Sequence, residues 1–174
     1  MTTNRALVIG LVAGEISGEN LAVDLIDTIA EQTGHTPKLV GVGGDRLRER
    51  GLKSVFDASE IALIGLTSVI ASLPRLIMRI NQTARAMIAA RPDVIILIDS
   101  PDFSHRVAKR LKKALPDVPV IKYVAPTVWA WRPERAAKMT GHIDHVLAIL
   151  PFEPDIMKKL GGPPTHYVGH PLAA

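Results

Sequence analysis

The sequence predicts an α/β fold with a doubly wound, mostly parallel, Rossmann-like sheet. Two apolar runs of strand length, residues 6–12 and 94–98, lack polar alternation, which is typical of strands buried on both faces of a parallel sheet. Each run is followed by a turn and then by a segment with helical apolar spacing. Because this alternation recurs along the chain, we expect helices on both faces of one sheet.

The strand at residues 94–98 is expected to be central, since it is continuously apolar and stops abruptly at an acid. Each further element is bounded by Gly, Pro, Asp or Asn, the residues that end strands and helices. The other expected strands span residues 6–12, 38–42, 53–56, 118–124, 142–150 and 165–168, and helices are expected up to residue 32 and at 45–50, 103–115, 133–140 and 151–160.

Composition limits the classes of protein that fit. With 174 residues, 47% of them hydrophobic, we expect a single domain spanning residues 1–174. The formal charge is +4, but Lys and Arg are scattered singly and only 4% of residues are aromatic, so nothing demands nucleic-acid binding. Cysteine is absent, which excludes disulfides and thiolate sites and favours the cytoplasm. No signal peptide is expected, because residues 1–5 lead directly into a strand.

Asp99 is the first catalytic candidate. It follows the central strand directly, and ligands of open parallel sheets bind beyond the carboxyl ends of the strands. We therefore expect its carboxylate to face an open crevice. The alternative is that Asp99 only orients the turn. Asp102, three residues on, is expected to be the N-cap of the next helix.

The turn after the first strand has the spacing Gly14-x-x-x-Gly18. It matches neither the dinucleotide fingerprint nor the phosphate loop. Backbone amides at the start of the following helix are suited to an anion or a sugar hydroxyl. A tight turn that needs small residues explains the spacing equally well.

The segment from Ile61 to Ile80 contains an apolar excess, with no charged residue between positions 61 and 73. It is too short to span a membrane. One interpretation is a crossover helix packed on the sheet. The other is a surface that contacts a membrane or acyl chains, with Arg75 and Arg79 available to lipid phosphates. The residues expected to make that contact are Ile64, Leu66, Val69, Ile70 and Leu73.

Both tryptophans of the chain, Trp129 and Trp131, lie in one short loop that ends in Arg132. Such a loop after a strand is suited to a sugar face and an anion, with one Trp expected to serve ordinary packing. His142 and His145 are expected on opposite faces of a strand, which argues against a metal site. His170, in a Gly-His-Pro turn near the end of the chain, is a further site candidate.

Five stretches together are specific enough to indicate a family: 13–18 (AGEISG), 98–103 (IDSPDF), 128–132 (VWAWR), 150–153 (LPFE) and 169–172 (GHPL). They occur in the order found in lipid A disaccharide synthases, and the chain resembles that family from Leu7 to its end. The resemblance implies half of an inverting GT-B glycosyltransferase with two Rossmann-like domains. Two positions depart from the family pattern, which usually has Asp where Glu19 stands and Asn where Ser104 stands.

The resemblance also implies an activity. The family joins UDP-2,3-diacylglucosamine to 2,3-diacylglucosamine 1-phosphate through a β-1,6 bond and releases UDP. Asp99 matches the family's essential acid and is expected to be the general base. Substrate contacts are expected from Glu15, Ser17, Gly18, Trp129, Trp131, Arg132 and His170, with Arg132 on the acceptor phosphate.

The expected location is cytoplasmic and peripheral to the inner membrane, whose surface is an expected partner. No metal or organic cofactor and no nucleic acid is expected, and homodimer formation is left open. Family members are roughly twice as long, so this chain is expected to be the acceptor-side domain, which lacks the nucleotide-sugar binding domain and is inactive alone. The rival hypothesis is a non-catalytic Rossmann-like module that binds an anionic ligand or partner.

Overall fold

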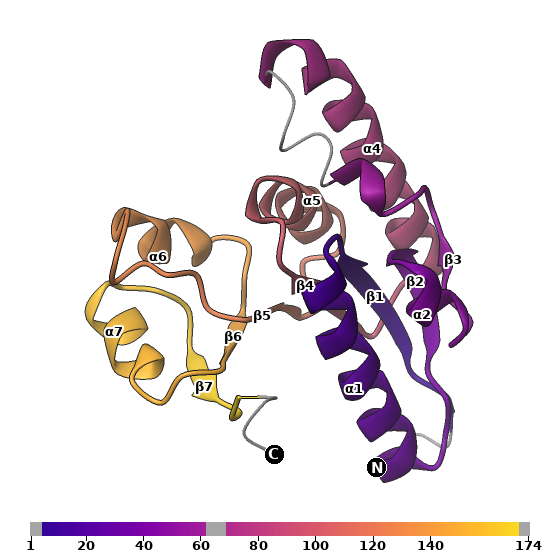
Figure 1. Ribbon diagram of the computed structural model, residues 1–174, viewed down its shortest axis with the longest axis horizontal. Helices are drawn as coiled ribbons and strands as arrows, with labels where there is room; N and C mark the ends of the chain where they lie inside the picture. The colour runs from indigo at the N-terminus through magenta and orange to yellow at the C-terminus, as the bar shows by residue number, and fades with distance from the viewer. Residues whose placement is uncertain (1–4, 62–68, 171–174) are drawn as a thin grey trace.

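The computed structural model describes residues 5–61 and 69–170, with only the backbone described for residues 69–72. The described strands form one seven-stranded sheet in the order β3-β2-β1-β4-β5-β6-β7, and every pair is parallel (Figure 1). The strands are β1 (Val8–Ala13), β2 (Lys38–Val42), β3 (Lys53–Ser54), β4 (Val94–Ile98), β5 (Val120–Tyr123), β6 (His145–Ala148) and β7 (Thr165–Tyr167).

Helices connect the strands and cover both faces of the sheet (Figure 1). The described helices are α1 (Ile16–Thr33), α2 (Asp45–Arg48), α4 (Val69–Ala90), α5 (Pro101–Ala114), α6 (Glu134–Met139) and α7 (Glu153–Lys159). This arrangement confirms the predicted doubly wound α/β class. None of the helices in the described part of the chain is both long and apolar enough to cross a membrane.

The central strand β4 shows why the sheet is buried on both faces. Successive side chains of a strand point to opposite faces. Ile95 and Leu97 belong to the core formed with α4 and α5, whereas Ile96 and Ile98 belong to the core formed with α1. All four are at most 4% exposed, so an uninterrupted apolar run is what this position requires.

The half of the sheet formed by β5, β6 and β7 is covered more thickly on one face than on the other. Val146 and Ala148 of β6 are fully buried in the core that α6 and α7 share. On the opposite face, the neighbouring residues Ile121, Tyr123 and Leu147 are only half-buried. Among the described residues, therefore, the second face of this half-sheet is incompletely covered.

Most predicted elements are confirmed, and the strands at residues 38–42 and 94–98 have the predicted bounds. Two predictions were wrong. Asp102 is the second residue of α5, and the N-cap is Ser100, because the chain enters the helix directly at Pro101, whose fixed φ suits a first helical position. The strand predicted at 142–150 begins only at His145, since His142 lies in the turn after α6.

Candidate functional site

The order of the strands places Asp99 at a topological switch point. From β1 the chain proceeds to β2 on one side, while β4 lies on the other side of β1 and continues to β5. At such a switch point the connections leave in opposite directions, and ligands bind in the crevice that opens there. Asp99 is the first residue after β4, and Gly14 is the first residue after β1. Two predicted site segments therefore meet at this point.

The carboxylate of Asp99 accepts two backbone hydrogen bonds from the turn after β1. The amide of Gly14 donates to Oδ1 at 3.1 Å, and the amide of Glu15 donates to Oδ2 at 3.2 Å. These amides directly precede α1, whose N-terminal end carries partial positive charge. The anion that this helix start receives is thus a carboxylate of the chain itself.

A glycine is needed at position 18 because the side chain of Asp99 lies close to its backbone. A Cβ atom built on Gly18 would lie 1.8 Å from Oδ2 of Asp99, so a larger residue at this position would displace the Asp99 carboxylate. One on Gly14 would lie 2.7 Å from the hydroxyl oxygen of Ser100. Of the two explanations offered for the Gly14-x-x-x-Gly18 spacing, both contribute: small residues allow the close approach, and the approach brings amides to an anion.

The backbone at Asp99 is held in an unusual conformation. Asp99 and Ser100 have φ values of 52° and 40°, in the left-handed region that residues with a side chain adopt at a cost. The carbonyl oxygen of Asp99 accepts hydrogen bonds from Lys122 Nζ at 2.8 Å and from Ser104 Oγ at 3.0 Å. Lys122 and Ser104 are both buried, so these bonds fix the strained turn from the side of the core.

Burial shifts the pKa values of two residues at this site, Asp99 and Lys122. Burial raises the pKa of Asp99, and it is opposed by the Gly14 amide, the Ser100 hydroxyl and the charge of Lys122. Burial also lowers the pKa of Lys122 to about 8, although Asp99 and Glu15 act in the opposite direction. A carboxylate with a raised pKa at a switch point is typical of an acid–base residue. Lys122 was missed in the sequence, where it appears only as one Lys in a short strand.

The other predicted residues of the first turn follow β1 at the same switch point. Glu15 and Ser17 are exposed, and Ile16 between them is 80% exposed. Asp99 itself is half-buried, which is less open than expected. It remains at the carboxyl edge of the sheet rather than inside it.

Glu19 has a structural role next to this turn. Its Oε1 accepts a hydrogen bond from the amide of Leu47 at 3.1 Å, and its carboxylate packs so closely on Gly44 that a Cβ there would lie 2.4 Å from Oε2. Glu19 thereby satisfies an amide of α2 and connects α1 to it. Its extra methylene, relative to Asp, is used to reach that helix.

The tryptophan loop contributes two cavities. Trp129 is 36% exposed and packs edge-on against Phe152, with ring centroids 5.2 Å apart, which matches the expectation that one Trp serves packing. Trp131 is 66% exposed, and the guanidinium of Arg132 lies 4.4 Å from its ring centroid. Arg132 lines a cavity of about 370 Å³ toward α7, whereas Trp131 also lines a second cavity of about 360 Å³ toward α5 and α6.

Two histidines form a pair that sequence reasoning did not predict. His105 on α5 and His142 in the turn after α6 place Nδ1 and Nε2 3.0 Å apart. Burial lowers the pKa of both, that of His105 to about 4. His170 follows β7, three strand positions from β4, so the described residues do not bring it to Asp99. No group of three or more metal-ligating side chains occurs among the residues that the structure describes.

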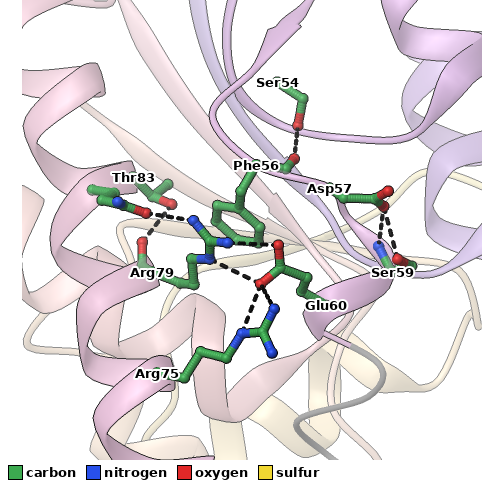
Figure 2. Close-up of polar contacts among 9 residues, drawn as sticks. Ser54, Phe56, Asp57, Ser59, Glu60, Arg75, Arg79 and Thr83 are labelled. Atoms are coloured by element: carbon green, nitrogen blue, oxygen red, sulfur yellow. Dashed lines mark hydrogen bonds and ion pairs between the residues drawn. The ribbon is translucent and has the colours of Figure 1, made fainter.

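Arg75 and Arg79, which were predicted to be available to lipid phosphates, form ion pairs with Glu60 (Figure 2). Arg79 is 2.6 Å from Glu60 Oε1, Arg75 is 2.9 Å from Glu60 Oε2, and Arg79 also lies over the ring of Phe56 at 4.8 Å. The side chain of Arg79 is 18% exposed and that of Arg75 is 60% exposed. The availability of Arg79 to a membrane was therefore wrongly predicted, because Glu60 was not recognised as its partner.

The predicted apolar contact lies partly outside the described residues. Ile64 and Leu66 fall in residues 62–68, and the side chains of Val69 and Ile70 are not described either. Leu73 is 38% exposed, and Ile77 and Met78 on the same helix are 40% and 44% exposed. The described part of α4 thus has an apolar exposed surface next to Arg75.

Comparison with known proteins identifies the family. A sequence profile described as "Lipid-A-disaccharide synthetase" matches residues 9–174. The chain belongs to the lipid-A-disaccharide synthetase family. Among curated relatives named lipid-A-disaccharide synthase, that of Nitrobacter winogradskyi is 46% identical over 171 residues, and that of Rhodopseudomonas palustris strain BisB18 is 46% identical over 172 residues. This confirms the resemblance drawn from the sequence.

These two alignments include 98% and 99% of this chain but only 43% of each relative. It therefore spans less than half the length of the family members that it matches. A solved structure described as the glycotransferase of kitacinnamycin aligns with a TM-score of 0.57 at 16% identity, over 95% of this chain and 52% of that one. At this identity the likeness concerns the fold, which is shared with a glycosyltransferase.

Gly18→Ala tests the close approach of α1 to Asp99. The added methyl group has no space beside Oδ2, and overpacking of this kind costs about 1–3 kcal/mol. We expect the free energy of unfolding, measured by urea denaturation, to fall by that amount. Gly141→Ala is the matched control, because nothing lies within 4 Å of a Cβ there. Equal stability of the two variants would contradict the packing described here.

The lowered pKa of Lys122 predicts a pH dependence of stability. Between about pH 8 and its ordinary value of 10.5, the unfolded chain holds this proton and the folded chain does not. The free energy of unfolding should therefore gain up to about 3 kcal/mol from this group as the pH rises through that window. Lys122→Met should lose this gain. Urea denaturation of both proteins at pH 8 and 10.5 measures the difference, and parallel pH dependences would refute the assignment.

Proposed function

We propose that this chain is the acceptor-side half of a lipid-A-disaccharide synthase. In the whole protein it would help to join UDP-2,3-diacylglucosamine to 2,3-diacylglucosamine 1-phosphate through a β-1,6 bond. The single observation that carries this proposal is the position of Asp99, half-buried at the switch point with a raised pKa and two amides on its carboxylate. The family relationship and the fold support the same reaction class.

In the proposed reaction Asp99 is the general base. The 6-hydroxyl oxygen of the acceptor attacks the anomeric carbon of the donor sugar, and its proton passes to a carboxylate oxygen of Asp99. The bond between that carbon and the phosphate oxygen of UDP breaks, so UDP leaves and the configuration at the carbon inverts. A positioned base of this kind contributes about 10²–10⁴ in rate.

The contacts of Asp99 suit this role. The carboxylate accepts one backbone bond on each oxygen and a further hydrogen bond from the Ser100 hydroxyl. Because an ionised carboxylate has about four acceptor sites, one is still left for a substrate hydroxyl. Burial makes the carboxylate a stronger base, and the amides keep its orientation when the proton arrives. Lys122 and Ser104 act as positioning residues, because they bind the carbonyl of Asp99 rather than its carboxylate.

The remaining predicted residues are proposed as substrate contacts. Glu15 and Ser17 are exposed beside Gly18 at the rim of the crevice, where they can reach sugar hydroxyls. Trp131 and Arg132 are exposed in the loop after β5 and can meet a sugar face and an anion. Trp129 and His170 lie further along the same edge and would contact the donor side or the second domain.

We also propose that the nucleotide-sugar binding domain belongs to the part of the family's length that this chain does not match. Residues 1–174 would then be one Rossmann-like domain of a GT-B pair. The incompletely covered face at Ile121, Tyr123 and Leu147 leaves apolar surface for further contacts. Dimer formation and a location at the cytoplasmic face of the inner membrane are part of the same proposal.

A specific observation favours a second candidate, an anion-binding module without catalysis. A cavity beside α5 and α6 is lined by Arg106, Lys109, Arg135 and Lys138. Release of UDP from the donor is assayed with this chain alone and with the part of a family member that this chain does not match added to it. A non-catalytic module releases no UDP in either assay. We expect release only from the two parts together, since positioning both substrates supplies much of the rate.

Asp99→Asn tests the proposed base in the whole protein. The amide keeps the shape of the carboxylate but cannot take the proton, so kcat for UDP release should fall about 10²–10⁴-fold. The amide also loses one acceptor for the Gly14 and Glu15 amides, so thermal unfolding must be measured in parallel. Asp117→Asn, at an exposed position before β5, is the matched control. Near-normal turnover of a folded Asp99→Asn protein would exclude Asp99 as the base.

Contact with a membrane is proposed for the exposed apolar surface of α4. Leu73→Ser/Met78→Ser should reduce sedimentation with vesicles that contain anionic lipid, since each buried methylene contributes about 0.8 kcal/mol. Tyr167→Ser/Val168→Ser removes two side chains of 52% and 48% exposure elsewhere and should leave sedimentation unchanged. If both variants sediment equally with the vesicles, the exposed apolar surface of α4 does not contact the membrane.

A further inference from the structure

The cavity between α5 and α6 is strongly basic. Arg106 and Lys109 line it from α5, and Arg135 and Lys138 line it from α6. The two α5 residues are three apart and so are the two α6 residues, so each pair lies on one face of its helix. The acid in the lining is Asp102. Two helices distant in sequence thus direct four cations and one carboxylate into about 360 Å³.

These cations differ from those that hold the fold together. Arg50, Arg79 and Lys112 each contact a carboxylate at 2.6–2.8 Å. Within the part of the chain that the structure describes, none of the four cavity cations forms an ion pair. Like charges that share a cavity repel one another. A bound anion would convert that repulsion into attraction.

His105, which also lines the cavity, is neutral near pH 7. Burial, together with the smaller effects of the charges on His142, Lys122, Lys109 and Arg135, lowers the pKa of His105 to about 4. A neutral imidazole paired with His142 at 3.0 Å still offers a hydrogen bond without requiring a fifth charge.

One wall of the cavity is suited to a sugar. Trp131 lines it with a ring that is 66% exposed, and Val128 and Met139 add apolar surface. Exposed indole faces pack against the apolar face of a pyranose ring. The lining therefore combines cations for an anionic group with a flat apolar surface for a ring, in a volume that accommodates a small molecule.

The cavity lies at the same edge of the sheet as Asp99. Asp102 at its rim is three residues after Asp99, and Thr127 follows β5, the neighbour of β4. A sugar whose hydroxyl reaches Asp99 can therefore extend toward the cavity. Arg132, expected to bind the acceptor phosphate, instead lines the cavity toward α7.

We propose that the α5–α6 cavity binds the phosphate of a hexosamine 1-phosphate through Arg106, Lys109, Arg135 and Lys138. This identification of the ligand rests on the proposed function, in which the acceptor sugar has such a phosphate. Trp131 contacts the sugar ring, and Asp102 accepts from one of its hydroxyls. Arginine forms paired bonds to phosphate oxygens and lysine provides point charges.

Direct binding tests the cavity without any catalysis. The 174-residue chain is titrated with glucosamine 1-phosphate, glucosamine and inorganic phosphate, and the fluorescence of Trp131 and Trp129 is recorded. Arg106→Gln/Lys109→Gln should weaken binding of glucosamine 1-phosphate at least about tenfold, because two of the four cations expected to bind the phosphate are removed. Glucosamine, which lacks the phosphate, should bind to the wild type much more weakly than glucosamine 1-phosphate does. Its affinity should be the same for the wild type and the variant.

The matched control is Arg85→Gln/Lys113→Gln, which removes one Arg and one Lys from exposed helical positions outside the cavity. It should bind glucosamine 1-phosphate within about twofold of the wild type, since the net charge is the same as in the test variant. Far-ultraviolet circular dichroism verifies that both variants are folded. Equal losses in both would mean diffuse attraction rather than a site and would overturn the proposal.

Two further arms separate other sources of phosphate. If Arg132→Gln abolishes binding and the cavity variant does not, the phosphate binds beside α7. If the cavity variant loses sedimentation with phosphatidylglycerol vesicles but keeps glucosamine 1-phosphate, the cavity recognises lipid headgroups; either result overturns the proposal. UDP release by a whole family member is a separate assay, so failure of the proposed transfer and failure of the phosphate site give different results.

Discussion

The bridge between Asp99 and the start of α1 is the contact on which the candidate site depends. Two segments 85 residues apart meet there, because parallel pairing of β1 with β4 brings both strand ends to one edge. The carboxylate satisfies amides that would otherwise lack a partner at a helix start, and the helix start in turn keeps the half-buried carboxylate oriented. Gly18 allows the approach, while Lys122 and Ser104 hold the strained turn from below. One side chain thus connects the central strands and presents a perturbed acid to the crevice.

The two residues that depart from the expected family pattern, Ser104 and Glu19, both form hydrogen bonds near this contact. Ser104 takes the place of an Asn and still donates to the Asp99 carbonyl from a fully buried position. Glu19 takes the place of an Asp and reaches the α2 amide across the glycines of the second turn. Both side chains thus form hydrogen bonds to backbone groups of neighbouring segments in this chain.

Two sets of cations in this protein have different surroundings. Those paired with carboxylates connect elements of the fold, as Arg79 of α4 does when it contacts Glu60 and the ring of Phe56 in the segment after β3 (Figure 2). Those around the α5–α6 cavity face one another, and in the described residues they form no ion pairs. Repulsion within such a cluster is a cost to the folded state unless a ligand compensates it.

The sequence by itself determined the fold class, the bounds of β2 and β4, the family, and Asp99 as the first candidate. These depend on local patterns: continuous apolar runs, turn residues and short motifs that stay together along the chain. Only the tertiary structure decided that Gly14 and Glu15 bind Asp99, that Glu60 engages Arg79, and that His105 pairs with His142. It also revealed Lys122 and the cavity cations, which look like scattered charges in the sequence. Such contacts depend on burial and on strand order, and no local pattern records which distant side chain will lie opposite.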